Sequence, residues 1–386
     1  MDKRIFLISF IICLIIFLVH IKIVGSVVWG DGRYYYSIAK SLAFDQDFNF
    51  ENEFELFSIN EWTSNTGLLV NKYPPGPALI LLPFLFVTGV FHCALETTFT
   101  CNQLGELQIY QIFSGIINIV VVFAGLYFLY CTLAKYYSSK VARSATLFTL
   151  FATNLFFYTS FDPVNSHAAS FFFASVLFFI LLTQKQNLIK WLFAGISLGW
   201  IAISRTIDGL LIIPAVYFFM QENDRMRKGI LFTTGFVSIF TIQIIFWLTI
   251  YGTFLSPYLD GNEGFSFFNP QLSRLLLNQN TGLLLWTPFV FLGFLGLFKV
   301  KEKFIKIFIV TILIMFYFIS SWSSWDQGGS FGIRMLISCL PMISFGFAEI
   351  FKREKWKKYI NLNPHQVIFV SATVNIIFII IYLLTH

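Results

Sequence analysis

Charged residues are scarce in this sequence, and their scarcity excludes a typical water-soluble domain. Only 12% of the 386 residues are Asp, Glu, Lys or Arg, whereas 57% are hydrophobic. An ordinary soluble domain carries about 25% charged residues. The net charge of +6 does not indicate nucleic-acid binding, because the basic residues fall in short clusters between apolar runs, as in the cytoplasmic turns of membrane proteins. We therefore expect membrane lipids, and no nucleic acid, around this chain.

Cysteine is rare and lacks the spacing of a metal site. No CxxC or Cys/His pattern joins the five cysteines, Cys13, Cys93, Cys101, Cys131 and Cys339. Most are interpreted as small buried apolar residues, and only Cys93 and Cys101 are close enough in sequence to suggest a pair. The sequence thus predicts no set of metal ligands, and it leaves a divalent metal open as a cofactor.

The alternating pattern of β-strands is also missing. The apolar residues instead form continuous runs, many of them about 20 residues long, which is the length of a transmembrane helix. We therefore predict an all-α, polytopic helical membrane protein. The apolar segments cover residues 5–28, 76–92, 108–130, 143–160, 167–183, 190–204, 209–221, 229–251, 282–298, 307–321, 333–351 and 366–384.

Charge distribution predicts the topology. The first run follows MDKR and is too long for a signal-peptide core, so it is interpreted as a retained helix with the N-terminus in the cytoplasm. From 135–143 onward, a basic cluster follows every second apolar segment, which places all of these clusters in the cytoplasm. For this alternation to agree with a cytoplasmic N-terminus, one of the apolar segments before residue 135 must not cross the membrane. The proline-interrupted segment 76–92 is the best candidate for a re-entrant or juxtamembrane helix, which leaves about eleven crossings.

The same topology predicts the domain organisation. Residues 1–386 form a single membrane domain with no soluble C-terminal domain, and two long polar intervals, 29–75 and 252–281, become external loops. The first loop is expected to carry juxtamembrane helices, and a disulfide between Cys93 and Cys101 is possible on the same side. The expected location is the plasma (inner) membrane, with the active site on its outer face.

Carboxylates, arginines and aromatic residues gather in the predicted outer segments. The first loop opens with VVWGDGRYYY and closes with NKYPPGP, and later outer segments read FDPVNSHAA, SRTIDG and SSWDQGGSFGIR. A carboxylate can deprotonate an acceptor hydroxyl, an arginine can bind a phosphate at headgroup depth, and aromatic faces pack against sugar rings. Together they predict a reaction on a substrate linked to a lipid phosphate.

Three of these motifs resemble a known family. Asp31 after the first apolar run, the tyrosines behind it and the later KYPPGP resemble the first external loop of GT-C glycosyltransferases. That superfamily includes protein O-mannosyltransferases, the aminoarabinose transferase acting on lipid A and the oligosaccharyltransferase catalytic subunit. FDPVNSHAA resembles their second acidic loop, and WDQGGSFGIRML resembles a late glycine–aromatic–arginine segment of their bacterial relatives. The lack of a large soluble domain argues against the oligosaccharyltransferase branch.

The resemblance implies a GT-C-like fold and an inverting transfer of a sugar from a polyprenyl-phosphate donor to a lipid, glycan or protein acceptor. Asp31 matches the carboxylate that activates the acceptor, and Asp162 matches the second acidic position. The carrier phosphate is expected to bind Arg205 and Arg334, with Lys72 as a third candidate. The remaining expected substrate contacts are Tyr35, His167 and Asp326.

Several polar and aromatic residues of the predicted outer segments also have a purely structural interpretation. Asp31 could simply form a GDG turn, and Asp162 followed by Pro163 would suit the first turn of the next helix. Arg205 and Asp208 could form a surface pair. Trp322 and Trp325 are better explained as interface anchors. The DQD at Asp45 and Asp47 is interpreted as part of a solvated acidic face with Glu51, Glu53 and Glu55.

Two other functions fit the same layout. A transporter or flippase of lipid-linked sugars would carry ionisable residues near the bilayer midplane and often an internal repeat, and the sequence shows neither pattern. A polysaccharide polymerase or ligase would also act on lipid-linked glycans at the outer face. It would use a diphosphate-linked oligosaccharide, so the donor separates it from the predicted enzyme.

Overall fold

The computed structural model describes residues 2–95, 101–183, 187–254, 263–328, 330–354 and 362–385. Within these ranges the chain is helical, and the only β-pairings are two isolated bridges, Thr63 with Leu69 and Phe265 with Trp322. Six helices are long and apolar enough to cross a membrane, and five shorter helices are also apolar. The predicted class, an all-α polytopic membrane protein, is confirmed.

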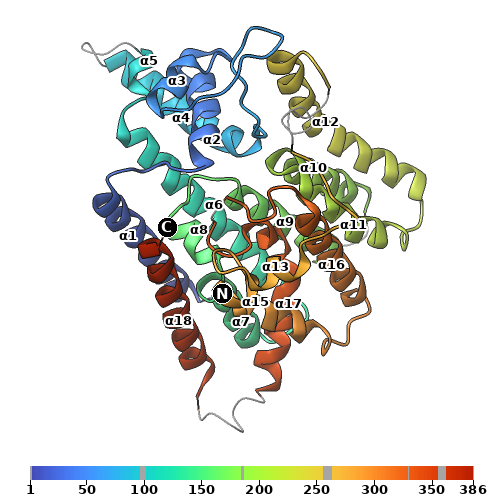
Figure 1. Cartoon of the computed structure of the whole chain (residues 1–386). Helices are drawn as coiled ribbons and strands as arrows, with labels where there is room; N and C mark the ends of the chain where they lie inside the picture. The colour runs from blue at the N-terminus through green and yellow to red at the C-terminus, as the bar shows by residue number, and fades with distance from the viewer. Residues whose placement is uncertain are drawn as a thin grey trace.

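The N-terminal third forms one long helix followed by a compact group of short ones. The helix α1 (Lys3–Val24) ends at Gly25, whose left-handed backbone terminates it. The interval predicted as the first external loop contains three short elements, and these gather with α4 and α5 at one end of the molecule, the top of Figure 1. The elements are α2 (Gly32–Lys40), the π-helical turn η1 (Ser41–Asp45), α3 (Glu51–Leu56), α4 (Gly76–Leu95) and α5 (Cys101–Leu104).

The segment 76–92 lies within one continuous helix of 20 residues, α4 (Gly76–Leu95). Its prolines interrupt it less than the sequence suggested. Pro77 lies in the first turn, where its missing N–H would have no partner in any case, and only Pro83 lies inside the helix. α4 contacts α2 and η1. Its expected re-entrant or surface position stays a prediction.

The central helices follow the predicted apolar segments closely, with one exception. The segment 143–160 divides into α7 and α8, because Ala152, Thr153 and Asn154 leave the helical path between them. α10 and α12 lie side by side. The central elements are α6 (Gln108–Ala134), α7 (Ser139–Phe151), α8 (Leu155–Ser160), α9 (His167–Thr183), α10 (Leu188–Ser204), the 3-10 helix η2 (Thr206–Leu211), α11 (Ile212–Phe219) and α12 (Arg225–Tyr251).

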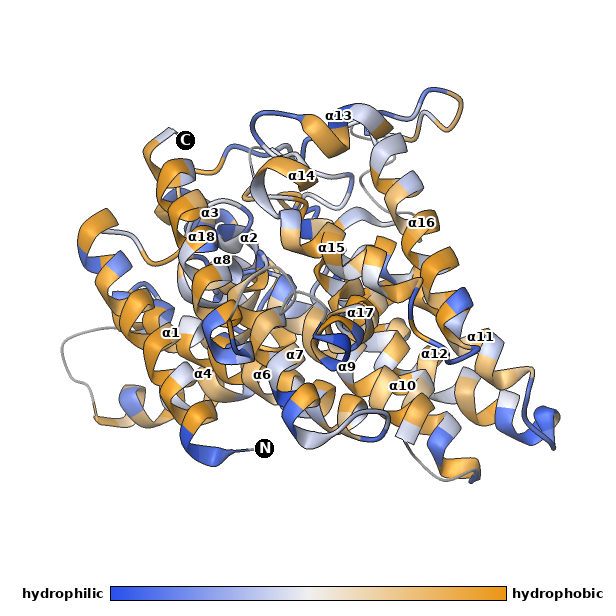
Figure 2. Ribbon diagram, turned by 90° about the horizontal axis from the view of Figure 1, so that it is seen from below, coloured by the Kyte–Doolittle hydropathy of each residue, from blue (hydrophilic) through white to orange (hydrophobic). Residues whose placement is uncertain are grey.

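The C-terminal elements complete one continuous apolar core that joins α1 to α18. They are α13 (Leu272–Leu277), α14 (Leu283–Trp286), α15 (Pro288–Leu297), α16 (Ile305–Ser321), the 3-10 helix η4 (Arg334–Cys339), α17 (Leu340–Arg353) and α18 (Pro364–Thr385). In Figure 2 the long helices are hydrophobic over most of their length, and the hydrophilic segments lie mainly in loops and at helix ends. This distribution is the one that a lipid environment requires.

Candidate active site

One cavity of about 650 Å³ brings together residues from both ends of the chain. Six of the eight residues predicted to form the site line it, namely Asp31, Tyr35, Lys72, His167, Arg205 and Arg334. The cavity is also lined by the apolar residues Ile207, Leu210, Phe265, Phe318, Trp322 and Met335. A lining of both charged and apolar side chains suits a ligand with a phosphate head and a hydrocarbon tail.

Asp31 is held by two partners from distant parts of the chain. It precedes α2, but its side chain makes no helix-capping hydrogen bond. Instead, the hydroxyl of Tyr73 donates to Oδ1 at 2.9 Å, and Nη1 of Arg334 lies 2.8 Å from Oδ2. The Asp31 side chain is 27% exposed and that of Arg334 is 19% exposed. The turn interpretation therefore explains the backbone, and the carboxylate itself faces the cavity.

Two glycines allow the loops around Asp31 to approach each other. A Cβ atom on Gly32 would lie 2.1 Å from the backbone oxygen of Val164, in the loop that carries Asp162. A Cβ on Gly76, in the KYPPGP motif, would lie 2.5 Å from the backbone oxygen of Ile203, near Arg205. Since neither obstacle is a movable side chain, a residue with a side chain would force the loops apart. These contacts bring the two first-loop motifs against the FDPVNSHAA loop and the end of α10.

Asp162 lies behind the cavity wall and does not line the cavity. Its Oδ1 atom is buried and has no hydrogen-bond partner among the described residues. Burial raises the pKa of this carboxyl to about 7, with the positive charge of Arg334 opposing the shift and the negative charge of Asp31 adding to it. Asp162 is thus electrostatically linked to both members of the Asp31–Arg334 pair.

The helix that follows Asp162 begins where the predicted apolar segment 167–183 begins, and not at Pro163. α9 starts at His167, and Oδ1 of Asn165 accepts a 2.7 Å hydrogen bond from the His167 N–H. The backbone N–H of Asp162 belongs to the preceding turn, because it donates to the oxygen of Phe157 at 3.1 Å. The interpretation of Asp162 and Pro163 as the start of the helix is therefore wrong. Asn165 instead accepts from the backbone N–H of His167, a buried donor at the start of the helix.

Arg205 is committed to other protein groups. Its Nη1 atom lies 3.0 Å from Nδ1 of His167 and donates to the backbone oxygen of Arg334 at 3.3 Å. Its Nε atom lies 4.0 Å from Asp208, which is fully buried and accepts a 2.8 Å hydrogen bond from Ser338. The predicted surface pair is therefore a buried one. Because an arginine only donates, Nδ1 of His167 accepts, and the ring proton lies on Nε2.

Lys72 and several aromatic residues also line the cavity. Nζ of Lys72 lies 2.8 Å from Oε1 of Glu263, so an ion pair joins the segment 29–75 to the segment preceding α13. Trp322 lines the cavity, although the sequence favoured an interface anchor. Asp326 is exposed and is not among the lining residues.

Several lining residues were not predicted as site residues. The sequence could have indicated Tyr73 as a site residue, since Tyr73 belongs to the KYPPGP motif. No such indication existed for the aromatic residues Phe265 and Phe318, because 50 phenylalanines are spread over the chain.

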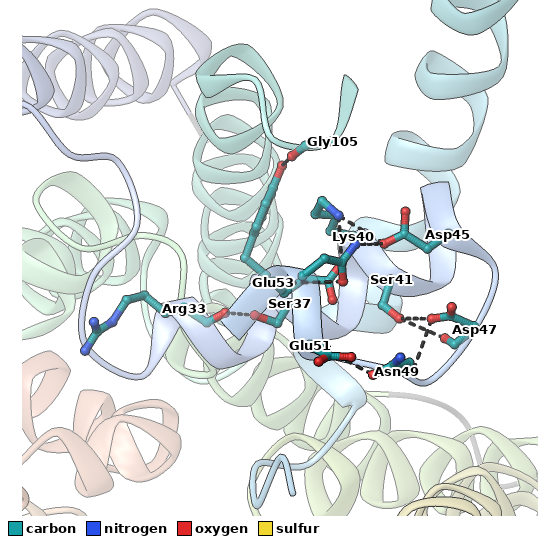
Figure 3. Close-up of polar contacts among 12 residues, drawn as sticks. Arg33, Ser37, Lys40, Ser41, Asp45, Asp47, Asn49, Glu51, Glu53 and Gly105 are labelled. Atoms are coloured by element: carbon teal, nitrogen blue, oxygen red, sulfur yellow. Dashed lines mark hydrogen bonds and ion pairs between the residues drawn. The ribbon is translucent and has the colours of Figure 1, made fainter. Parts of the chain in front are cut away.

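A buried ionic cluster supports α2, which carries Tyr35 into the cavity. Nζ of Lys40 lies 3.0 Å from Asp45 and 2.7 Å from Glu53, and the Lys40 and Glu53 side chains are both 0% exposed (Figure 3). The prediction of a solvated acidic face is therefore wrong for Asp45 and Glu53. It holds for Asp47, Glu51 and Glu55, which are exposed. Burial raises the pKa of Glu53 to about 8, while Lys40 opposes this shift.

The described residues do not suit a metal ion. They contain no group of three His, Cys, Asp or Glu side chains that could hold one. Both oxygens of Asp31 already have protein partners. Cys93 is disulfide-bonded, and the side chain of Cys101, its predicted partner, lies outside the described residues.

Comparison with known proteins supports the GT-C resemblance. The family model for dolichyl-phosphate-mannose-protein mannosyltransferase matches residues 110–247. Among proteins of curated function, none matches the chain by sequence.

Two solved proteins share its fold. ArnT from Cupriavidus metallidurans, in the apo state and bound to undecaprenyl phosphate, aligns with TM-scores of 0.56 and 0.57, at 12% identity and over 93% and 92% of this chain. The archaeal oligosaccharyltransferase AglB from Archaeoglobus fulgidus, in complex with an inhibitory peptide and a dolichol-phosphate, aligns with a TM-score of 0.52 at 12% identity over 99% of this chain. The chain spans 62% of the ArnT structures and 55% of AglB.

These comparisons define the class of fold: the chain has described helices long and apolar enough to cross a membrane, and it shares the fold of ArnT and AglB. The resemblance to GT-C glycosyltransferases that the sequence suggested is confirmed for the fold.

Proposed function

We propose that this protein transfers a sugar from a polyprenyl-phosphate carrier to an acceptor at the outer face of the plasma membrane, with inversion at the anomeric carbon. One observation carries the proposal. Asp31 lies in a cavity lined by both cationic and apolar side chains, in a fold shared with an ArnT structure that binds undecaprenyl phosphate. The acceptor is a lipid, a glycan or a protein.

In the proposed reaction, Asp31 acts as the general base. Its carboxylate takes the proton of the acceptor, and the acceptor atom attacks the anomeric carbon from the side opposite the phosphate. The bond between that carbon and the phosphate oxygen breaks, and the polyprenyl phosphate leaves with the electron pair. A single base and a direct displacement give inversion, and no covalent enzyme intermediate is required.

The cations of the cavity are proposed to bind the carrier phosphate. Arg334 and Lys72 face the cavity from different loops and can neutralise the charge that develops on the leaving phosphate. Arg205 is proposed to act mainly as a positioning residue, because its guanidinium orients His167 and the backbone of Arg334. His167 and Tyr35 then offer neutral hydrogen-bond donors to the sugar. Asp162 is proposed to orient Arg334 from behind.

The test is a transfer assay with the chain reconstituted in lipid nanodiscs. Polyprenyl-monophosphate sugars should be consumed with release of the polyprenyl phosphate, and Asp31→Asn should lower kcat by about 10²- to 10⁴-fold, the usual loss for a general base. If Asp31→Asn transfers sugar at the wild-type rate, Asp31 is not the general base. Use of only diphosphate-linked oligosaccharides would favour a polymerase or ligase, and movement of the donor across the bilayer without bond cleavage would favour a flippase.

A further inference from the structure

The cations that face the cavity are already neutralised. Arg334 is paired with Asp31 at 2.8 Å, and Lys72 is paired with Glu263 at 2.8 Å. A carrier phosphate therefore finds a protein carboxylate on each cation it is proposed to bind. The pair at Arg334 is unusual because its carboxylate is also the proposed base.

We propose that the carrier phosphate replaces Asp31 on Arg334, so that donor binding releases the base. This inference rests on the proposed function. Arg334 can form charge-assisted hydrogen bonds with either anion. The donor phosphate is a diester with one negative charge, as Asp31 has, and it gains negative charge as the sugar leaves. Because Asp31 occupies Nη1 of Arg334, a phosphate bound at that atom competes with Asp31 for it. Oδ2 of Asp31 becomes available to the acceptor only when the donor is in place.

Asp31 does not swing away when the pair opens, because Tyr73 still holds it. The Tyr73 hydroxyl donates to Oδ1, the oxygen that Arg334 does not use. The ring of Tyr73 packs against Tyr34 and Tyr35, with centroids 4.6 and 5.3 Å away. One oxygen therefore remains anchored while the other exchanges its partner. Asp162 also interacts electrostatically with Arg334.

The exchange makes the reaction ordered. Without the donor, the proton-accepting oxygen of Asp31 is occupied, and an acceptor hydroxyl has no free base. With the donor bound, the phosphate takes the position on the Arg334 guanidinium that Asp31 held. Oδ2 of Asp31 can then take the acceptor proton as the new glycosidic bond forms. The leaving phosphate then stays on Arg334 until it departs and Asp31 returns.

A double-mutant cycle on carrier binding tests the exchange, since it needs no turnover. The probe is labelled undecaprenyl phosphate or dolichyl phosphate bound to the protein in nanodiscs, with undecaprenol as the neutral control lipid. Asp31→Asn removes the competing charge and should tighten phosphate binding by about 3- to 30-fold, while binding of undecaprenol stays unchanged. Arg334→Gln should weaken phosphate binding by about 10- to 100-fold.

The combined variant separates competition from simple repulsion. In the Arg334→Gln background, Asp31→Asn should no longer tighten binding, because the shared partner is gone. Glu55→Gln is the matched control, since Glu55 is an exposed carboxylate of the same loop and does not line the cavity. Asp31→Ser makes the same test if Asp31→Asn cannot be purified.

Each outcome has a definite reading. Unchanged or weaker binding in Asp31→Asn overturns the exchange and leaves the proposed function standing. Equal tightening with and without Arg334 also overturns it, because long-range repulsion then suffices. If the wild-type protein binds neither carrier phosphate more tightly than undecaprenol, both the exchange and the proposed function fall.

Discussion

The hydroxyl of Tyr73 donates a 2.9 Å hydrogen bond to Oδ1 of Asp31, so the end of the segment between α1 and α4 holds the residue at its beginning. Tyr73→Phe removes this bond and keeps the ring that packs between its neighbours. Because a loosely held base reacts from fewer productive positions, we expect kcat to fall by about 10-fold with an unchanged donor KM.

Steady-state kinetics with varied donor concentration measures this split. Tyr34→Phe is the control, since the Tyr34 hydroxyl donates to Glu61 and Tyr34 does not line the cavity. A rise in KM with constant kcat for Tyr73→Phe would contradict a positioning role.

Substitutions of Lys72 and Glu263 test whether Lys72 binds the carrier phosphate or only forms a structural ion pair. The pair is about one-quarter exposed on each side, so its contribution to stability is small, about 0–1 kcal/mol. If Lys72 binds the carrier phosphate, Lys72→Met raises the donor KM by about 10-fold, and Glu263→Gln leaves it unchanged or lowers it. Equal effects of the two substitutions on KM would instead indicate that the ion pair only joins the loops.

Gly32 should tolerate no side chain. In Gly32→Ala the new methyl group would meet the backbone oxygen of Val164 at 2.1 Å, so the two loops must separate. We expect a loss of about 1–3 kcal/mol in the free energy of unfolding and a clear loss of transfer activity as Asp31 moves. Thermal unfolding in detergent and the transfer assay measure both. Gly264→Ala, which has no neighbouring atom within 4 Å, should be neutral.

The buried cation Lys40 should be needed for stability. Lys40→Met leaves Glu53 and Asp45 buried without their positive partner, and breaking a buried ion pair from one side costs about 3–5 kcal/mol. The melting temperature in detergent should fall clearly below that of Lys303→Met, since Lys303 is exposed. If Lys40→Met and Lys303→Met have equal melting temperatures, the ion pairs of Lys40 are not needed to stabilise the segment 29–75.

Asp162 should make stability depend on pH. Its folded-state pKa of about 7 exceeds the ordinary value of 3.8, so the folded protein keeps a proton that the unfolded chain releases between about pH 4 and about pH 7. The free energy of unfolding therefore falls as pH rises through this window and is level above it. Asp162→Asn should remove this part of the slope, as measured by melting temperature against pH. If the melting temperature of Asp162→Asn depends on pH in the same way as that of Asp326→Asn, the Asp162 carboxyl is not a buried charge.

The sequence by itself determined the class of protein and most of its helices. Long apolar runs leave little choice in lipid, because every backbone donor and acceptor must be satisfied within the segment. The segment 167–183 matches α9 residue for residue, and 307–321 differs from α16 only at its start. Asp31 and Arg334 could be selected as site residues because carboxylates and arginines are rare in such a chain and stood beside glycines and aromatic residues.

Only the tertiary structure decided which polar residues meet. The sequence grouped Glu53 with exposed acids, yet Lys40 draws it into a buried cluster across a turn. It left open whether Asp162 begins the next helix, yet that helix begins at His167, whose backbone N–H donates to Asn165. The pairing of Asp31 with Arg334 depends on loop approaches as close as that of Gly32 to Val164. Periodicity reports the face and length of a helix, whereas contacts between residues far apart in the chain depend on how the helices pack.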